Sequence, residues 1–326
     1  MIPNVSVDYR WWPSLLSCLA LFPLHGNAAY PEKPIRFVVP YSAGGPTETL
    51  ARLVGKGLTN SLGRSVVIDL RPGASTIIGT EIVAKAPADG YSIVAVSTTH
   101  TVNPALFKKL PYDPIRDFAP VTLMAATPFM LCTNSAVPAR SVQELISLAK
   151  AKPGELAFGS GGSGSSLHLT AEFFNGLARI KMVHVPYKGA GPAFIDLVAG
   201  QVQVLFSSSV SSLPYVKSGR VRVLAVTSLK RSAAAPDVPT VAESGFPGFE
   251  SSSWFGVMAP AKTAKPIVLR LQQEIGAVLK SPDVRDTLAS LGAEPGGMPS
   301  VEFGNYFKAE MVKWGKVVRD AGIVAD

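Results

Sequence analysis

Residues 35–48 have the sequence IRFVVPYSAGGPTE, in which the apolar run 35–39 leads into a glycine-rich loop and a proline that suits a first helical turn. Glycine lets the backbone approach a ligand closely, and the start of a helix presents unpaired N–H groups with partial positive charge. The loop over residues 41–48 is therefore predicted to form a cradle for an anion.

A second strand–loop–helix junction of this kind follows much later in the chain. The residues LAF at 156–158 lead into GSGGSGSS at 159–166. If the two loops belong to separate lobes, they would contact a ligand from opposite sides. Tight strand-to-helix turns also contain glycine in folds that bind nothing there, so the motif by itself leaves a purely structural role open.

The composition is that of a folded protein without a nucleic-acid partner. The chain has 326 residues, enough for two domains or one large one, with 47% hydrophobic and 17% charged residues, which argues against disorder. The net charge is +8, but basic residues cluster only in pairs such as Lys108-Lys109, whereas nucleic-acid-binding proteins concentrate their charge. The surplus of positive charge indicates at most a weak preference for anionic partners.

Residues 1–29 have the features of an export signal peptide. Arg10 precedes the apolar stretch 11–24, and Gly26-Asn27-Ala28-Ala29 offers small residues for cleavage. The stretch is too short and too interrupted by proline for a membrane span, which needs about eighteen apolar residues, and no later segment reaches that length. The sequence therefore predicts an exported, periplasmic protein.

The two cysteines bear on anchoring and on redox chemistry. Residues 15–18, Leu-Leu-Ser-Cys, loosely resemble a lipoprotein cleavage box, but the apolar run continues past Cys18. Ordinary cleavage further on is therefore favoured over a lipid anchor at Cys18. Once the signal is removed, Cys132 is the remaining thiol, so an internal disulfide is excluded and stability must come from the core.

Strand and helix signals alternate almost throughout the chain, which predicts an α/β fold with largely parallel sheets. Helical periodicity follows the first loop as far as Gly63, and Ser141 and Glu144 form a capping box. Three C-terminal helices are expected, with apolar cores within residues 267–275, 284–291 and 303–314. No obvious linker divides the chain, but the two loops imply two lobes. Extended stretches at residues 118–122 and 251–255 are the expected crossings between them, and two connecting strands would act as a hinge.

We therefore expect a discontinuous first lobe, residues 30–122 with 251–326, and a second lobe, residues 123–250. Several short motifs, in a fixed order over nearly all of the chain after the signal, then indicate a family. They are Tyr30-Pro31 with Pro34-Ile35, Ala43-Gly44-Gly45, Asp89-Gly90-Tyr91, Leu110-Pro111-Tyr112-Asp113-Pro114, Asp117-Phe118-Ala119-Pro120-Val121, His184-Val185-Pro186-Tyr187-Lys188-Gly189, Gly200-Gln201-Val202, Leu224-Ala225-Val226-Thr227 and Pro239-Thr240. With these motifs the sequence resembles the extracytoplasmic solute receptors of the tripartite tricarboxylate transporter family, often called Bug-type receptors.

The resemblance implies a periplasmic binding protein of the type II topology, with a ligand cleft between two lobes and a two-strand hinge. It implies a small organic carboxylate as ligand, held by backbone amides, hydroxyls and bridging waters, and delivered to the membrane subunits of a transporter. The alternative is a ligand-sensing receptor that presents its closed form to a signalling protein. The expectation is a monomer that is not an enzyme and has no cofactor.

Carried over residue by residue, the resemblance places the ligand among five segments: the first glycine loop, the end of a strand near residue 97, the second glycine loop, the stretch 187–189 and the end of a strand near residue 207. The implied ligand-binding residues are Tyr41, Ser42, Ala43, Gly44, Gly45, Ser97, Thr98, Thr99, His100, Gly161, Gly162, Ser163, Ser165, Ser166, Tyr187, Lys188, Gly189, Ser207 and Ser208.

Four departures from the pattern of this family bear on the ligand. Glu48 and Gln203 stand where relatives have Asp, Ser75-Thr76-Ile77 stands for Gly-Gly-Asn, and Ser207-Ser208 stands for Asp-Asn. Fewer acidic groups near the cleft weaken the case for a ligand with an ammonium group, and Ile77 would make the wall more apolar if its loop faces the cleft. The hypothesis is a carboxylate without an amine, aromatic or branched.

A nicotinamide-dependent enzyme is the remote alternative. Gly159-x-Gly161-x-x-Gly164 matches the dinucleotide-binding fingerprint, which also requires an acidic residue about twenty positions further on. The next strand instead ends at residues 186–188 without an acid. No nucleophile elbow or Walker motif is present, and His100, His168 and His184 lack metal-ligand spacing, so no metal is expected.

Overall fold

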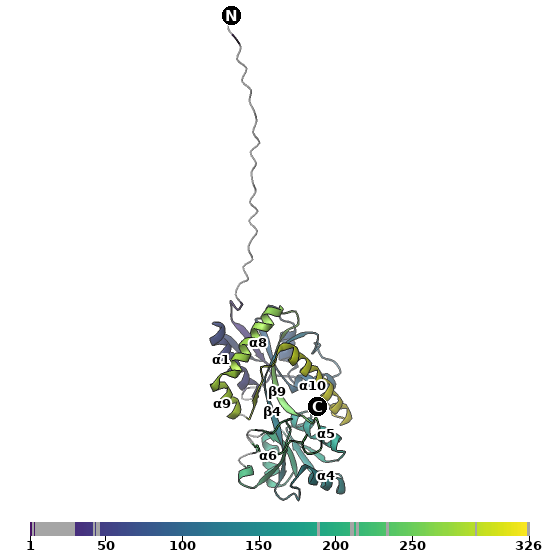
Figure 1. Ribbon diagram of the computed structural model, residues 1–326. Helices are drawn as coiled ribbons and strands as arrows, with labels where there is room; N and C mark the ends of the chain where they lie inside the picture. Colours follow the sequence, from purple (N-terminus) through teal and green to yellow (C-terminus); the bar gives the residue numbers. More distant parts are fainter. Residues whose placement is uncertain are drawn as a thin grey trace.

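The computed structural model describes residues 1, 3, 30–41, 43, 46–187, 190–208, 212, 215–232, 235–290 and 292–324. In them, strands and helices alternate over most of the chain and form two α/β lobes, one above the other in Figure 1. The expectation of largely parallel sheets is wrong, because both sheets are mixed and every pairing of β4 and β9 is antiparallel. The expected export signal, with Cys18, lies outside the described residues apart from Met1 and Pro3. Within the described ranges, no helix combines the length and the apolar character needed to cross a bilayer.

The sheet of the first lobe has the strand order β2-β1-β3-β9-β4-β10. The strands β1, β2 and β3 are parallel, whereas β9 runs antiparallel to both β3 and β4. The strand bounds are β1 Ile35–Val39, β2 Val66–Leu70, β3 Ser92–Ser97, β4 Phe118–Asn134, β9 Ser252–Pro260 and β10 Glu294–Pro295.

The sheet of the second lobe has the order β8-β4-β7-β5-β6, with β5 parallel to both β6 and β7. Its other strands are β5 Ala157–Ser160, β6 Val183–Pro186, β7 Val204–Ser208 and β8 Val221–Val226. The glycine loops follow β1 and β5, and each ends at the start of a helix. The structure therefore confirms both predicted strand–loop–helix junctions.

Helices cover both sheets. In the first lobe they are α1 Pro46–Leu62, α2 Ile77–Ala84, α3 Thr98–Leu106, α8 Lys265–Lys280, α9 Pro282–Ser290 and α10 Ser300–Asp320. In the second lobe they are α4 Val142–Ala151, α5 Ser166–Ala178 and α6 Ala190–Ala199. The three expected C-terminal helices are α8, α9 and α10, and Ser141 Oγ accepts a hydrogen bond from the Glu144 N–H at the start of α4, as the capping motif predicts.

One unbroken strand, β4, belongs to both sheets. Its residues 118–128 pair with β9, and its residues 129–134 pair with β7 and β8 (Figure 1). On strand pairing, we propose that the first crossing between the lobes lies at Pro128 and Phe129, inside the stretch that the sequence assigned to the second lobe. An uninterrupted extended run contains no turn residue to mark such a boundary.

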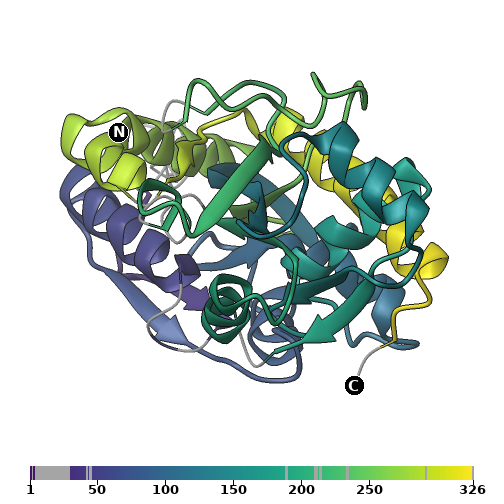
Figure 2. The ribbon, with the colours of Figure 1, turned by 90° about the horizontal axis from the view of Figure 1, so that it is seen from below.

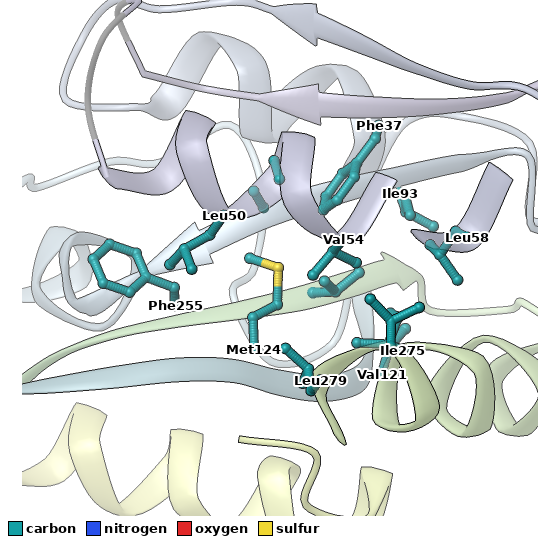
Figure 3. Close-up of a cluster of buried hydrophobic side chains, with 14 of the residues drawn as sticks. Phe37, Leu50, Val54, Leu58, Ile93, Val121, Met124, Phe255, Ile275 and Leu279 are labelled. Carbon is teal, nitrogen blue, oxygen red and sulfur yellow. The ribbon is translucent and has the colours of Figure 1, made fainter. Parts of the chain in front are cut away.

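Each lobe has its own hydrophobic core. In the first lobe, one face of α1 packs through Leu50, Val54 and Leu58 onto β1, β3 and β4, and Ile275 and Leu279 of α8 close the cluster (Figure 3). This is the helical face that the periodicity of α1 predicts. The second lobe has a separate cluster around Phe158, Phe174 and Phe206. The two cores indicate that each lobe is a unit of packing in its own right.

The C-terminal helix α10 packs against both lobes. Its residues Trp314, Val317 and Val318 form a buried cluster with Val102 of α3, in the first lobe, and Leu169 of α5, in the second. Figure 2 shows this long yellow helix running beside the teal helices of the second lobe. The chain crosses between the lobes along β4 and again at the start of β9, and we call β4 and β9 the two shared strands. The helix therefore forms a further link between the lobes.

A buried carboxylate joins α10 to one of the shared strands. Glu310 is 5% exposed, and its Oε2 accepts hydrogen bonds from the indole N–H groups of Trp254 on β9 (3.1 Å) and Trp314 (2.7 Å). Lys313 forms an ion pair with Glu310 and donates to the Glu250 carbonyl oxygen (3.1 Å), just before β9. These contacts pair the buried charge and satisfy both indoles, as burial requires.

Truncation of Glu310 is expected to destabilise the protein more than its neutral replacement. Glu310→Ala leaves two buried indole N–H groups without an acceptor, and should lower the free energy of unfolding in urea by about 3 kcal/mol. Glu310→Gln keeps an amide oxygen for the indoles and should lose about half as much. Equal losses for the two variants would contradict a role as indole acceptor.

Candidate functional site: a cavity between the lobes

A cavity of about 300 Å³ lies between the two lobes. Residues from both lobes and from both shared strands line it. Its lining residues are Pro46, Thr49, Leu50, Thr127, Phe129, Ser166, Leu167, Ala190, Ser207, Ser208, Ser253, Phe255 and Ala293. A concave site between lobes is a common location for a small-molecule ligand.

Three helices begin at the cavity. Pro46, Ser166 and Ala190 line it and are the first residues of α1, α5 and α6. The first turn of a helix has unpaired N–H groups, and the helix dipole adds partial positive charge there. Because α1 belongs to the first lobe and the other two to the second, positive potential reaches the cavity from both sides, which suits an anion.

The two shared strands form one side of the cavity. Thr127 and Phe129 lie two residues apart on β4, and Ser253 and Phe255 lie two residues apart on β9, so each pair shares one face of its strand. Thr127 and Ser253 are also direct partners across the two strands. Any rotation of one lobe against the other must therefore move residues that line the cavity.

Within the part of the chain that the structure describes, no charged side chain lines the cavity. Hydroxyl groups come from Thr49, Thr127, Ser166, Ser207, Ser208 and Ser253. The rest of the wall is apolar, with two phenylalanines and two leucines as its largest members. The described part of the wall can bind an anion through hydroxyls, backbone N–H groups and helix dipoles.

Hydrogen bonds to Ser160 and His184 hold the second glycine loop in shape. Ser160 Oγ accepts a hydrogen bond from the Gly162 N–H (3.1 Å) and lies 2.6 Å from His184 Nε2. Gly162 has a φ of 118° and Gly164 has a φ of 71°, values that residues with a side chain rarely adopt. Of the three glycines in the apparent dinucleotide fingerprint, Gly164 thus has a conformational reason of its own.

A pair of stacked histidines lies beneath this loop. The rings of His168 and His184 are 3.7 Å apart, and His168 Nδ1 accepts a hydrogen bond from the Gly164 N–H (3.1 Å). This bond requires a neutral ring with its proton on Nε2, which lies 3.8 Å from Glu172 Oε1. Burial, and then the neighbouring His184, lower the pKa of His168 to about 4, and burial lowers the pKa of His184.

The stability of the protein is expected to fall below pH 6.5. Folding lowers the pKa of His168 from its usual 6.5 to about 4, so its contribution is fully present above pH 6.5 and is lost as the pH falls toward 4. Holding one such group neutral at pH 5 costs about 2 kcal/mol. Urea denaturation at pH 7.5 and pH 5 should show this loss, and it should be about 2 kcal/mol smaller in His168→Asn, which keeps an oxygen for the Gly164 N–H. An equal loss in both proteins would contradict the assignment.

The structure brings three of the implied ligand-binding residues to the cavity: Ser166, Ser207 and Ser208. Near them, Ser165 caps α5 by accepting a hydrogen bond from the His168 N–H (3.3 Å). Gly161, Gly162 and Ser163 form the loop before α5, and Ser163 is exposed. The hydroxyl of Tyr187 donates to Asp196 Oδ2 of α6 (2.7 Å), and burial and that carboxylate raise the pKa of Tyr187 to about 12.

The ligand-binding residues that the resemblance implies near Ser97 form hydrogen bonds within the first lobe and do not line the cavity. The Tyr41 hydroxyl lies 2.5 Å from Ser97 Oγ, which links the first glycine loop to the start of α3, and burial raises the pKa of Tyr41 to about 12. Thr98 Oγ1 bonds weakly to Ser252 and Trp254 of β9 (3.5 and 3.4 Å). Ala43 is exposed and Thr99 is half-buried, and neither lines the cavity.

The structure places His100 away from the cavity. It is 1% exposed and packs among the rings of Tyr112, Phe118 and Phe307 at centroid distances of 5.2–5.7 Å. Burial lowers its pKa to about 3, so it is neutral at physiological pH. Ser42, Gly44, Gly45, Lys188 and Gly189 lie outside the described residues, so their part in the site stays a prediction.

Of the four departures, the structure brings only Ser207-Ser208 to the cavity wall. Ile77 packs in the core of the first lobe, so the expectation of a more apolar wall at that position is wrong. Gln203 bonds to the Ala157 N–H (2.9 Å) and to the Gly200 carbonyl oxygen (3.3 Å), a structural role. Glu48 is 7% exposed, and its carboxylate forms an ion pair with Arg52 one turn along α1 (2.6 Å).

The turn before α2 is strained. Ala74, Ser75 and Thr76 have φ values of 45°, 49° and 76°, a left-handed conformation that costs about 1–2 kcal/mol for each residue with a side chain. Among the described residues, the buried Thr76 Oγ1 also has no hydrogen-bond partner. The Asn103 side chain holds the turn by donating to the Ser75 carbonyl oxygen (2.8 Å).

Thr76→Gly is expected to stabilise the protein by about 1 kcal/mol. The substitution relieves the left-handed strain and removes a buried hydroxyl without a partner, which together outweigh the greater freedom of glycine in the unfolded chain. Thr80→Gly is the matched control one turn further on, where Thr80 Oγ1 donates to the Thr76 carbonyl oxygen (2.9 Å), and it should destabilise. A loss of stability in Thr76→Gly, measured by urea denaturation, would contradict the conclusion that the backbone at Thr76 is strained.

Sequence reasoning missed most of the cavity wall. Thr127 and Phe129 of β4 and Ser253 and Phe255 of β9 are among the missed residues, as are Leu50 and Leu167. A signal for the strand residues existed, since the strands that connect two lobes border the cleft between them. Leu50 and Leu167 have no such signal, because an apolar residue on a helix face looks like any other core residue.

Comparisons with known proteins agree with this geometry. A family model described as "Tripartite tricarboxylate transporter family receptor" matches residues 50–323. A "UPF0065 protein in tcbD-tcbE intergenic region" from Pseudomonas sp. strain P51 is 40% identical over 292 residues, which cover 89% of this chain and 87% of that protein.

Two solved structures are similar over almost their whole length. One is "R. palustris Rpa4515 with adipate", 38% identical with a TM-score of 0.75, covering 91% of this chain and 100% of that chain. The other is MatC (Rpa3494) from Rhodopseudomonas palustris with bound malate, 32% identical with a TM-score of 0.71, covering 89% of this chain and 100% of that chain.

Two α/β lobes, two shared strands and a cavity between the lobes define a two-lobed solute-binding protein. The two similar structures of this fold contain adipate and malate. The chain belongs to the receptors of the tripartite tricarboxylate transporter family, which confirms the resemblance.

Proposed function

We propose that this protein is a periplasmic receptor that closes its two lobes on a small organic carboxylate and delivers it to a membrane transporter. The observation that carries the proposal is the cavity at which α1, α5 and α6 begin, with one helix start from the first lobe and two from the second. The carboxylates in two similar structures support it.

The wall of the cavity has enough donors for a useful affinity. A hydrogen bond to a charged group contributes roughly 1.5–3 kcal/mol net, and a helix start adds about 0.3–1 kcal/mol. Micromolar binding corresponds to about 8 kcal/mol after the costs of association and ordering. Four to six contacts from hydroxyls such as Ser166 and Ser207 and from backbone N–H groups, with an enclosing apolar wall, reach that value.

The same wall disfavours an amine on the ligand. An ammonium group needs a carboxylate or several oxygen acceptors when it leaves water. None of the described lining residues is acidic, and the three helix starts would repel a cation. The proposed ligand is therefore a carboxylate without an amino group.

Capture and closure are one equilibrium in this proposal. A ligand that touches both lobes favours the closed form by the difference between its affinities for the closed and open forms. The two shared strands and the contact of α10 with both lobes restrict that motion. Delivery to a transporter is preferred over the sensing role because the matching family is one of transporter receptors.

Serine variants test the cavity better than glycine variants, since substitution of Gly162 at a φ of 118° would alter the loop itself. Calorimetry with adipate as the probe, on protein unfolded in urea and refolded to release any carried ligand, should show saturable binding. Ser166→Ala and Ser207→Ala should each weaken it about tenfold, because each removes a hydroxyl from the wall.

The matched control is Ser163→Ala, in the same glycine loop as Ser166 but exposed and outside the cavity. It should bind as the unmodified protein does. Refolded protein that binds none of adipate, succinate, benzoate and cyclohexanecarboxylate would overturn the proposed function. Weakening by Ser163→Ala together with normal binding by Ser166→Ala would place the site elsewhere.

A further inference from the structure

The large apolar side chains of the cavity wall come in two similar pairs. The first lobe contributes Leu50 from α1 and Phe255 from β9, and the second contributes Leu167 from α5 and Phe129 from β4. Each pair thus joins a leucine near the start of a helix to a phenylalanine on a shared strand. We refer to these four residues as the apolar wall.

The apolar wall is continuous with the cores of the two lobes. Leu50 and Phe255 belong to the core cluster of the first lobe, and Figure 3 shows them side by side at one end of it. Phe129 and Leu167 belong to the core cluster of the second lobe. Their exposed fractions are 2%, 4%, 4% and 7% for Leu50, Phe255, Phe129 and Leu167. Packed side chains of this kind cannot turn away to admit water beside a polar ligand.

Backbone contacts also fix the two phenylalanines. The Phe129 N–H donates to Thr227 Oγ1 (2.7 Å), and the Phe129 carbonyl oxygen accepts from the Thr227 N–H (2.9 Å). Phe255 pairs with Ser97 of β3 on one side and with Ala125 of β4 on the other. The backbone at each phenylalanine is therefore held by hydrogen bonds or strand pairing to neighbouring segments.

Each of these four residues has a hydroxyl residue of the wall one or two positions before it in the chain. Thr49 and Ser166 belong to the first turns of α1 and α5, Thr127 and Ser253 face each other across the shared strands, and Ser207 and Ser208 end β7. These hydroxyls and the helix starts are the groups suited to carboxylate oxygens. The hydrocarbon part of a bound molecule is left to contact leucine and phenylalanine.

We infer that Leu50, Leu167, Phe129 and Phe255 are the specificity-determining residues of this receptor, and that they select a carboxylate whose body is a hydrocarbon chain or ring without hydroxyl groups. The inference rests on the proposed function and deepens it. A ligand methylene group buried here is stabilised, whereas a hydroxyl group at the same place loses its water and gains no partner.

Two matched ligand pairs test this selection. Adipate and galactarate are six-carbon dicarboxylates that differ by four hydroxyl groups, and cyclohexanecarboxylate and quinate differ in the same way on a ring. In calorimetry, the hydroxyl-free member of at least one pair should bind 30-fold or more tighter than its partner. A preference below 30-fold in both pairs, with at least one of these carboxylates bound, overturns the inference and leaves the proposed function intact. Failure of these four carboxylates, and of succinate and benzoate, to bind overturns both.

A pair of isosteric variants assigns the selection to the wall. Leu167 is the most exposed of the four, so its replacement is the most easily tolerated. Valine and threonine side chains have the same shape, so Leu167→Val and Leu167→Thr differ only in that a methyl group of valine is a hydroxyl group in threonine. The preference for adipate over galactarate, or for cyclohexanecarboxylate over quinate, should be at least fivefold smaller in Leu167→Thr than in Leu167→Val.

Circular dichroism and thermal melting establish that both variants are folded. If either is not, Leu50→Val and Leu50→Thr provide the same comparison from the first lobe. Equal preferences in the valine and threonine variants would show that the apolar wall does not select the ligand, and would overturn the inference.

Discussion

The pairing of β4 with β9 is the constraint on which the rest of this structure depends. β4 runs without a break from one sheet into the other, and β9 accompanies it from Ser252 to Pro260. The pairing shifts register between Pro120 and Thr122 and between Leu123 and Ala125, and two antiparallel strands paired on both sides of such irregularities can twist and bend but cannot slide past each other. Thr127 and Ser253 lie opposite each other on these strands and line the cavity, which couples lobe rotation to the shape of the site.

The charge that the cavity presents comes from the backbone. The starts of α1, α5 and α6 reach it from two lobes, while the described lining side chains are hydroxyls and hydrocarbons. A backbone site of this kind keeps its preference for anions when side chains change, because every helix start offers the same N–H groups. Affinity for carboxylates and choice among carboxylates are thus separate properties, and Leu50, Leu167, Phe129 and Phe255 bear only on the second.

The second glycine loop shows why a motif can have two explanations at once. Gly162 and Gly164 have φ values of 118° and 71°, and their N–H groups bond to Ser160 and His168. Those bonds fix the approach to Ser166, which lines the cavity. The loop conformation therefore requires glycine, and this conformation fixes where α5 begins. The stacked, neutral His168 and His184 support this arrangement from below.

Local sequence patterns were sufficient for the α/β alternation, for both glycine junctions and for the three C-terminal helices, because apolar periodicity, capping residues and turn residues act over a few positions. Motif order was sufficient for the family. The cavity wall was not predictable in this way: Leu50, Phe129, Leu167 and Phe255 are far apart in the chain and look like ordinary core residues, and His100 looked like a cleft residue but lies among three aromatic rings. Which apolar side chains stop at the edge of a core, and so face a ligand, depends on how two lobes pack around two shared strands, and no local pattern records that packing.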